Sequence, residues 1–194
     1  EKIKQVVDVR KGEIMFGLNM IVHKGKTIFI GDTSVHEYPT SEQMAEIAMS
    51  TARVVRLFGF DPKVAFVSHS TFGQPLTSRT KHIRDAVEIL KDKKVDFEFD
   101  GDMQPDVALN SEYEQLYPFA SIVGKANILI MPGQHSAAIS YKLMKTIGDT
   151  KVIGPLLIGL GLPIEIAPLR SSTSEIINLA SIAAYSSKVI DYKK

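Results

Sequence analysis

The spacing of hydrophobic positions changes from strand-like to helix-like early in the chain. Residues 14–22 and 27–30 are rich in apolar residues, and residues 24–26 between them are typical of a hairpin turn. Over residues 44–58 the apolar positions recur every three or four residues, which predicts an amphipathic helix. The first third of the chain is therefore expected to form a β-hairpin followed by a helix.

Local signals bound these elements. Thr40 and Gln43 have the spacing of a capping box, and Gly59 marks the end of the helix. A turn at Pro62 leads into a predicted strand at 64–68 and a polar loop. Beyond the loop we expect a helix that buries Ile83, Ala86, Val87 and Leu90, and then a half-exposed strand through Val95, Phe97 and Phe99.

The second half repeats this alternation. Residues 127–131 are an uninterrupted apolar run, typical of a strand buried on both faces. A helix with Ala137, Tyr141 and Met144 directed inward should end at Gly148, and further β segments are expected from 152–153 and at 164–167. A second capping box, Ser172 and Glu175, starts a last helix that should bury Ile176, Leu179, Ala180 and Ala183. Strands that alternate with helices predict a three-layer α/β fold with helices on both faces of the sheet.

Composition narrows the possible functions. The 194 residues carry a net charge of +1 with no basic stripe, so we expect no nucleic-acid partner. Cysteine is absent, which removes thiolate catalysis and thiolate zinc sites and fits a cytoplasmic protein. The apolar run at 152–164 is too short to span a bilayer, and no signal peptide is evident. Because the sequence starts at Glu1, we expect a part of the protein upstream of it.

Three loops could bind phosphate where strands give way to helices. The first contains Ser68, Ser70 and Gly73, whose hydroxyls and amides could hold a phosphate or satisfy only their own backbone. The second contains Gly133, His135 and Ser136; His135 could also be a helix cap or a solvent-facing side chain. In the third, Arg170, Ser171 and Ser172 gather at a helix start, although Glu175 there is explained by capping alone. We expect the three loops to converge on a single cleft.

Metal chemistry is not indicated. The five histidines have no paired ligand spacing, so no metal site is predicted. Asp100, Asp102 and Asp106 allow either a divalent-metal cluster or a turn followed by a helix cap, and the turn is favoured.

Several segments together resemble the phosphotransacetylase family. They are Asp32-Thr33 with Pro39-Thr40, residues 58–65, Ser68-His69-Ser70, and residues 100–109, 126–130 and 153–160. The matches are ordered and cover nearly the whole chain. Residues 116–119 and 131–136 are similar to the version of the domain that is appended to bacterial NADP-dependent malic enzymes, whereas Ala137-Ala138 and Ile158 differ from stand-alone acetyltransferases.

The resemblance implies a two-lobed fold, similar to isocitrate and isopropylmalate dehydrogenases, with the first part missing. Residues 1–165 would form mainly the second lobe, and residues 166–194 would return to the first. It also implies acetyl-CoA or a related acyl-CoA as ligand, with Gly154 and Pro155 among the contacting residues. NADP and a divalent metal are expected only in the upstream malic enzyme part, with a homodimer or higher oligomer as the assembly.

The segment before the last helix departs from the stand-alone members of the family. Those enzymes carry Ser-Arg-Gly and then an aspartate, which help to bind CoA and to deprotonate its thiol. Here Glu175 takes the place of the aspartate, Leu169 takes that of the arginine, and Arg170 follows one position late. A regulatory acetyl-CoA module is therefore expected. The alternatives are a catalytic phosphate acetyltransferase that uses Glu175 and Arg170, and a dimerisation platform with a vestigial site.

Overall fold

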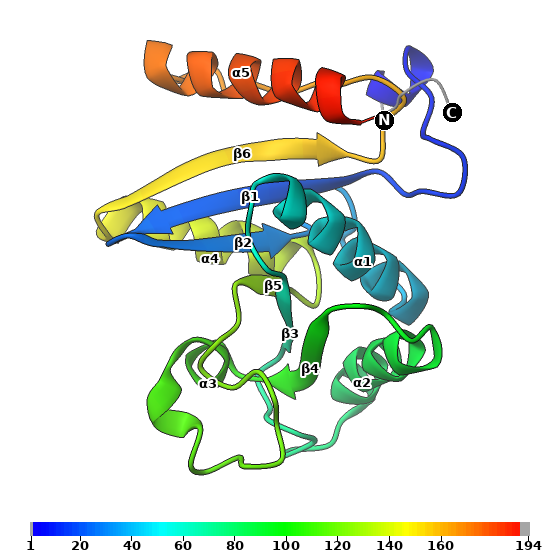
Figure 1. The fold of residues 1–194 in the computed structure, drawn as a ribbon, viewed down its shortest axis with the longest axis vertical. Coiled ribbons are helices and arrows are strands. Elements are labelled where there is room, and N and C mark those ends of the chain that lie inside the picture. Colours follow the sequence, from blue (N-terminus) through cyan, green and yellow to red (C-terminus); the bar gives the residue numbers. More distant parts are fainter. Residues whose placement is uncertain (1, 191–194) are drawn as a thin grey trace.

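The computed structural model describes residues 2–190 and shows one mixed six-stranded sheet in the order β4-β3-β5-β2-β1-β6 (Figure 1). The strands are β1 (Phe16–His23), β2 (Lys26–Gly31), β3 (Lys63–Val67), β4 (Glu98–Met103), β5 (Ile128–Ile130) and β6 (Thr150–Ile158). The helices are α1 (Ser41–Leu57), α2 (Ser78–Asp92), α3 (Pro105–Leu109), α4 (Gln134–Ile147) and α5 (Thr173–Val189), with short 3₁₀ turns at Lys2–Gln5 and Ser111–Tyr113. None of the helices in the described part of the chain has the length and apolarity needed to cross a membrane.

Strand direction determines which loops can meet. β1 and β2 form the predicted antiparallel hairpin, and β6 pairs antiparallel with β1 at the outer edge. β2, β5, β3 and β4 all run parallel to one another. The carboxyl ends of these four strands therefore lie along the same edge of the sheet.

Helices cover both faces of the sheet, as predicted. One hydrophobic core lies between the sheet and α1, α2 and α5, and includes Phe16, Phe29 and Phe66. The other lies against α3 and α4 and includes Ile21 and Ile30. Neighbouring residues of one strand, such as Phe29 and Ile30, enter opposite cores because side chains alternate across a strand.

Most of the predicted elements are confirmed. Both capping boxes form, at Thr40 with Gln43 and at Ser172 with Glu175. Gly59, just beyond α1, has a φ of +83°, a left-handed conformation that glycine adopts without strain. The four apolar residues predicted to face inward on α2 are all buried.

Two predicted strands are placed wrongly. β4 begins at Glu98 and runs to Met103, so the strand expected at Val95 starts later and includes the acidic segment predicted to be a turn. The stretch 164–167 forms no strand, since Glu165 makes only an isolated bridge to Leu156. Pro163 and Pro168 flank this stretch, and a proline has no amide to donate to a ladder.

The last helix is less buried than predicted. Leu179 is 6% exposed, but Ile176 is 50% exposed, Ala180 is exposed and Ala183 is half-buried. α5 lies beside the edge strand β6 (Figure 1), so only part of its apolar surface reaches the sheet. Most of the apolar side chains of α5 are therefore accessible on this chain.

Candidate functional site

Two of the three predicted loops meet at the carboxyl edge of the sheet. The loops that follow β3 and β5 line one cavity of about 340 Å³. Its walls are formed by Val67, Ser68, His69, Arg79, Ile83, Pro105, Met131, Pro132 and Ser136. Arg79 carries no signal in the sequence as a site residue, because only the fold brings the first turn of α2 against these loops.

The loop after β3 is held from within by a buried carboxylate. Ser70 is fully buried and donates a hydrogen bond from its hydroxyl to the Asp102 carboxylate. The Gly73 amide donates to the other oxygen of Asp102 at 3.0 Å. Ser70 and Gly73, both predicted to contact phosphate, thus fix the loop, while Ser68 remains on the cavity wall.

The same contacts bear on Asp100, Asp102 and Asp106, for which the sequence allows either a divalent-metal cluster or a turn followed by a helix cap. Asp102 lies in β4 and faces Ser70 and Gly73, so the predicted turn is wrong. Asp106 lies in the first turn of α3 and accepts a hydrogen bond from the Tyr113 hydroxyl at 3.1 Å. Among residues 2–190, no group of three or more acidic or histidine side chains could hold a metal ion.

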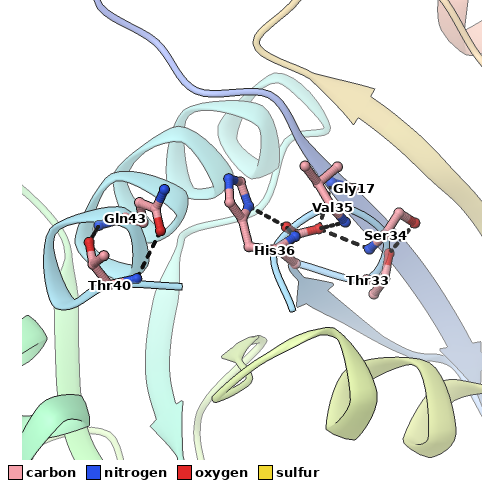
Figure 2. Close-up of polar contacts among 8 residues, drawn as sticks. Gly17, Thr33, Ser34, Val35, His36, Thr40 and Gln43 are labelled. Carbon is pink, nitrogen blue, oxygen red and sulfur yellow. Dashed lines mark hydrogen bonds and ion pairs between the residues drawn. The ribbon is translucent and has the colours of Figure 1, made fainter. Parts of the chain in front are cut away.

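The loop after β2 is organised by Asp32, a residue that spacing alone did not single out. Figure 2 labels the residues that contact it. One Asp32 oxygen accepts from the amides of Gly17, Ser34 and Val35 at 2.9, 2.9 and 3.2 Å. The other accepts from the His36 amide at 2.8 Å and lies 2.6 Å from His36 Nδ1. Burial raises the pKa of the Asp32 carboxyl, but the hydrogen bonds from His36 and the backbone outweigh it, so its pKa is lower than usual.

This loop also supports the start of α4. The Gln134 amide donates to the His36 carbonyl at 3.0 Å, and His135 Nε2 lies 3.5 Å from a Glu37 oxygen. A Cβ on Gly133 would lie 2.3 Å from the Glu37 carbonyl oxygen, so the close approach of the two loops requires glycine. Gly133 and His135 therefore support the loop contact, while Ser136 donates to the Gly133 carbonyl at 2.8 Å and borders the cavity.

The third predicted loop lies elsewhere, so the expected single cleft is wrong. Ser171 and Ser172 line a different cavity of about 780 Å³ between α4, β6 and α5. The walls also include Tyr141, Lys142, Lys145, Lys151, Gly154, Pro155, Pro168, Ser174, Glu175 and Asn178. After β6 the chain returns along the edge of the sheet, which places the start of α5 beside the middle of β6 and the second half of α4. The two cavities lie against opposite ends of α4.

The larger cavity is basic. Lys142, Lys145 and Lys151 border it together with the hydroxyls at the start of α5, where the helix dipole favours anions. These lysines are not among the site residues predicted from the sequence. Lys142 and Lys145 lie three positions apart on α4, a spacing that could have indicated a shared face.

Glu175 is tied into the wall of this cavity. Its carboxylate accepts from the Ser172 amide at 2.8 Å and from Lys145 Nζ at 3.0 Å. These two bonds, led by the one from the Ser172 backbone, lower the pKa of Glu175 to about 2. A carboxylate with such a low pKa is a weak acceptor for a thiol proton at neutral pH. Arg170 is exposed and lies outside the walls of both cavities.

The capping box of α5 offers a direct check of this arrangement. Ser172→Ala should lower the free energy of unfolding by about 1 kcal/mol, because the Glu175 amide loses its acceptor. Ser174→Ala, in the same first turn, is the matched control and should change the free energy by less than about 0.5 kcal/mol. Urea denaturation of both variants measures the difference; equal losses would contradict the capping role of Ser172.

Comparison with known proteins agrees with this architecture. The family described as phosphate acetyl/butaryl transferase matches residues 1–184. The chain belongs to this family. A phosphotransacetylase structure from Streptococcus pyogenes superposes with a TM-score of 0.89 at 30% identity, over 95% of this chain and 57% of that chain.

Relatives within the family fall into two groups. An NADP-dependent malic enzyme of Rhizobium meliloti (strain 1021) is 43% identical over 95% of this chain, which spans 24% of that protein. A phosphate acetyltransferase of Bacillus subtilis (strain 168) is 30% identical over 93% of this chain, which spans 56% of that enzyme. The chain thus spans about a quarter of the malic enzyme relative, and the resemblance found in the sequence is confirmed.

Proposed function

We propose that this chain is the phosphotransacetylase-like domain of an NADP-dependent malic enzyme and that it binds acetyl-CoA, or a related acyl-CoA, as a regulatory module. The observation that carries the proposal is the basic cavity between α4, β6 and α5. Lys142, Lys151 and the start of α5 line a volume of about 780 Å³, which is within the usual range for a cofactor site. Lys145 lines it too and is paired with Glu175 at 3.0 Å. The phosphates of CoA suit such a lining, since lysine ammonium groups bind phosphate as point charges.

The regulatory step requires a second site outside this chain. In the malic enzyme that we propose, the upstream part would hold NADP, a divalent metal and malate. Acetyl-CoA would set the activity of that part only if it binds two states of the protein with different affinity. We further propose a cytoplasmic homodimer or higher oligomer, in which residues 166–194 pack against the first lobe. The large exposed apolar side chains of α5, such as Ile176 and Ile177, support a partner surface there.

A catalytic phosphate acetyltransferase is the second candidate, and the similarity to phosphotransacetylases favours it. The state of Glu175 argues against it, because the residue at the position of the catalytic aspartate is held by Lys145 and Ser172. Thioester formation from CoA and acetyl phosphate is the decisive assay. Turnover abolished by Glu175→Gln would establish the acetyltransferase and displace the regulatory proposal.

Acetyl-CoA binding can be measured directly by thermal unfolding. At about a hundred times its dissociation constant, acetyl-CoA should add roughly 2.7 kcal/mol to the free energy of unfolding. Lys142→Ala combined with Lys151→Ala should weaken binding by at least about tenfold, because two charge-assisted contacts are lost. Lys91→Ala combined with Lys93→Ala, two exposed lysines at the end of α2 and just beyond it, is the control of equal charge and should bind like the parent.

The outcome separates the remaining alternatives. If acetyl-CoA leaves the unfolding temperature unchanged, the domain is a dimerisation platform with an empty site. If both lysine pairs weaken binding equally, attraction is a general effect of net charge and the cavity is not the binding site. Arg170→Ala tests the earlier expectation for that residue: its exposed position predicts a smaller effect than loss of the two cavity lysines.

A further inference from the structure

The smaller cavity, at the carboxyl edge of the sheet, combines a cation with apolar walls. Val67, Ile83 and Met131 are buried and line it, and Arg79 borders it from the first turn of α2. Ser68, which is 6% exposed, contributes a hydroxyl. Mostly apolar walls with a few polar groups are the usual form of a small-molecule site.

Arg79 is positioned by an aromatic ring. Its guanidinium carbon lies 5.9 Å from the centre of the Tyr38 ring, a cation–π geometry that orients the group without neutralising it. Arg53 and Arg56 each pair with a carboxylate, at 3.3 and 3.0 Å. Arg79 makes no such ion pair within residues 2–190. Its guanidinium donors therefore remain available to an anionic ligand.

The remaining polar groups of the cavity are preorganised. Ser68 Oγ accepts from the Ser70 amide at 3.2 Å, and Ser70 is itself anchored to the buried Asp102. The start of α4 contributes Ser136 to the cavity wall, and Gly133 supplies no side chain to cap this helix. The positive end of the α4 dipole thus adds to the charge of Arg79.

The charge and the apolar surface of the smaller cavity together indicate the chemical class of its ligand. A guanidinium forms two parallel hydrogen bonds with a carboxylate, which carries one negative charge. A phosphate group carries up to two charges and three acceptor oxygens, and a wall rich in Val67, Ile83 and Met131 would leave much of it unsatisfied. We propose that this cavity binds a short-chain organic acid, with its carboxylate on Arg79 and its hydrocarbon body against the apolar wall.

This site is independent of the proposed acyl-CoA site. The two cavities share none of their lining residues and lie against opposite ends of α4. Failure of acetyl-CoA binding would therefore leave the organic-acid proposal intact, and the reverse also holds.

The test is a titration of the full chain followed by heteronuclear NMR, with acetate, butyrate, hexanoate and inorganic phosphate as probes. Butyrate should shift the signals of the Arg79 guanidinium and the Ile83 methyl groups, and should bind more tightly than acetate or phosphate. Arg79→Ala should weaken butyrate binding by at least about tenfold, the loss expected for one bidentate charge-assisted contact. Arg79→Lys should recover only part of it, because an ammonium cannot form the planar pair.

A matched control removes the same charge from the same helix. Lys81 is exposed on α2, pairs with Asp85 at 3.0 Å and lies outside the cavity. Lys81→Ala should bind butyrate like the parent chain; equal weakening in both variants would overturn the role of Arg79. Tighter binding of phosphate than of butyrate would overturn the assignment to a carboxylate. Competition between acetyl-CoA and butyrate would overturn the separation of the two sites.

Discussion

Asp32→Asn should lower the free energy of unfolding by about 3–5 kcal/mol, the cost of disrupting a buried charged network. The Asp32 side chain is 1% exposed and accepts the three amides of Gly17, Ser34 and Val35 on one oxygen. An asparagine oxygen can keep those three bonds. Its amide nitrogen would then face the His36 amide, and two donors cannot satisfy each other.

Asp85→Asn is the control, because the Asp85 carboxylate is about half exposed and pairs with Lys81 one turn away on α2. That change should alter the free energy by less than about 0.5 kcal/mol. Urea denaturation at neutral pH compares the two variants. Losses of similar size would show that the buried network contributes nothing beyond a surface ion pair.

The pH dependence gives a second measure of the same carboxylate. The pKa of Asp32 is lower in the folded protein than its ordinary value of 3.8, so the unfolded chain takes up the proton first as the pH falls. The stability that Asp32 provides is thus complete above about pH 4 and is lost as the pH falls through the folded pKa. The difference in stability between the parent and Asp32→Asn should shrink in acid.

The loop that Asp32 organises contacts two elements beside the smaller cavity. Its residue Tyr38 lies beneath Arg79, and Glu37 approaches Gly133 at the start of α4. Asp32 is therefore a positioning residue for the proposed organic-acid site, although it is not among the residues that line the cavity. Loss of butyrate binding in Asp32→Asn would be expected, whereas acetyl-CoA binding should be less affected because its cavity lies at the other end of α4.

Local signals in the sequence were sufficient for most of the fold. The capping boxes at Thr40 and Ser172 and the turn between β1 and β2 act through residues only a few positions apart. Periodicity also predicted the buried face of α2, because one side of that helix packs continuously on the core. These features depend on residues that lie close to one another in the sequence.

Predictions that depended on distant partners were less successful. Aspartate beside glycine is typical of a turn, which is why the sequence favours one at Asp102. The structure instead buries Asp102, because Ser70, 32 positions away, donates a hydrogen bond to it. The burial of Ile176 was overestimated because nothing in the sequence shows that α5 lies at an edge strand. The prediction of a single phosphate-binding cleft was wrong for the same reason, since the path of the chain after β6 determines where Ser171 lies.

One part of the expected site is nevertheless present in the structure. Hydroxyls and helix starts do lie beside cavities, at Ser68 and Ser136 in one and at Ser171 and Ser172 in the other. The charges that distinguish the two came from outside the predicted loops. Three lysines make the larger cavity suitable for the phosphates of CoA, whereas the single Arg79 suits a carboxylate.

The second large effect is expected at Glu165, which lies between β6 and α5 on the segment that leads to the proposed acyl-CoA cavity. Its carboxyl accepts from the Leu157 amide at 3.1 Å and borders a cavity with Leu160 and Ile182. Burial there raises its pKa from 4.5 to about 8, although the Leu157 hydrogen bond opposes the shift. As the pH rises above 4.5, the unfolded chain loses this proton before the folded chain does. The free energy of unfolding should thus fall between about pH 4.5 and 8 and stay level above that.

Glu165→Gln should remove this dependence, because glutamine is neutral throughout and keeps an oxygen for the Leu157 amide. At about pH 9 the variant should be more stable than the parent, on the order of 2–3 kcal/mol once solvent screening of this half-buried group is allowed for. At about pH 4 the two should be nearly equal, since both carry a neutral side chain there. Urea denaturation across this range measures the effect, with Glu88→Gln on the exposed face of α2 as the control. If the parent and Glu165→Gln follow parallel curves, Glu165 is ionised in the folded protein, and the segment that leads to α5 tolerates its charge.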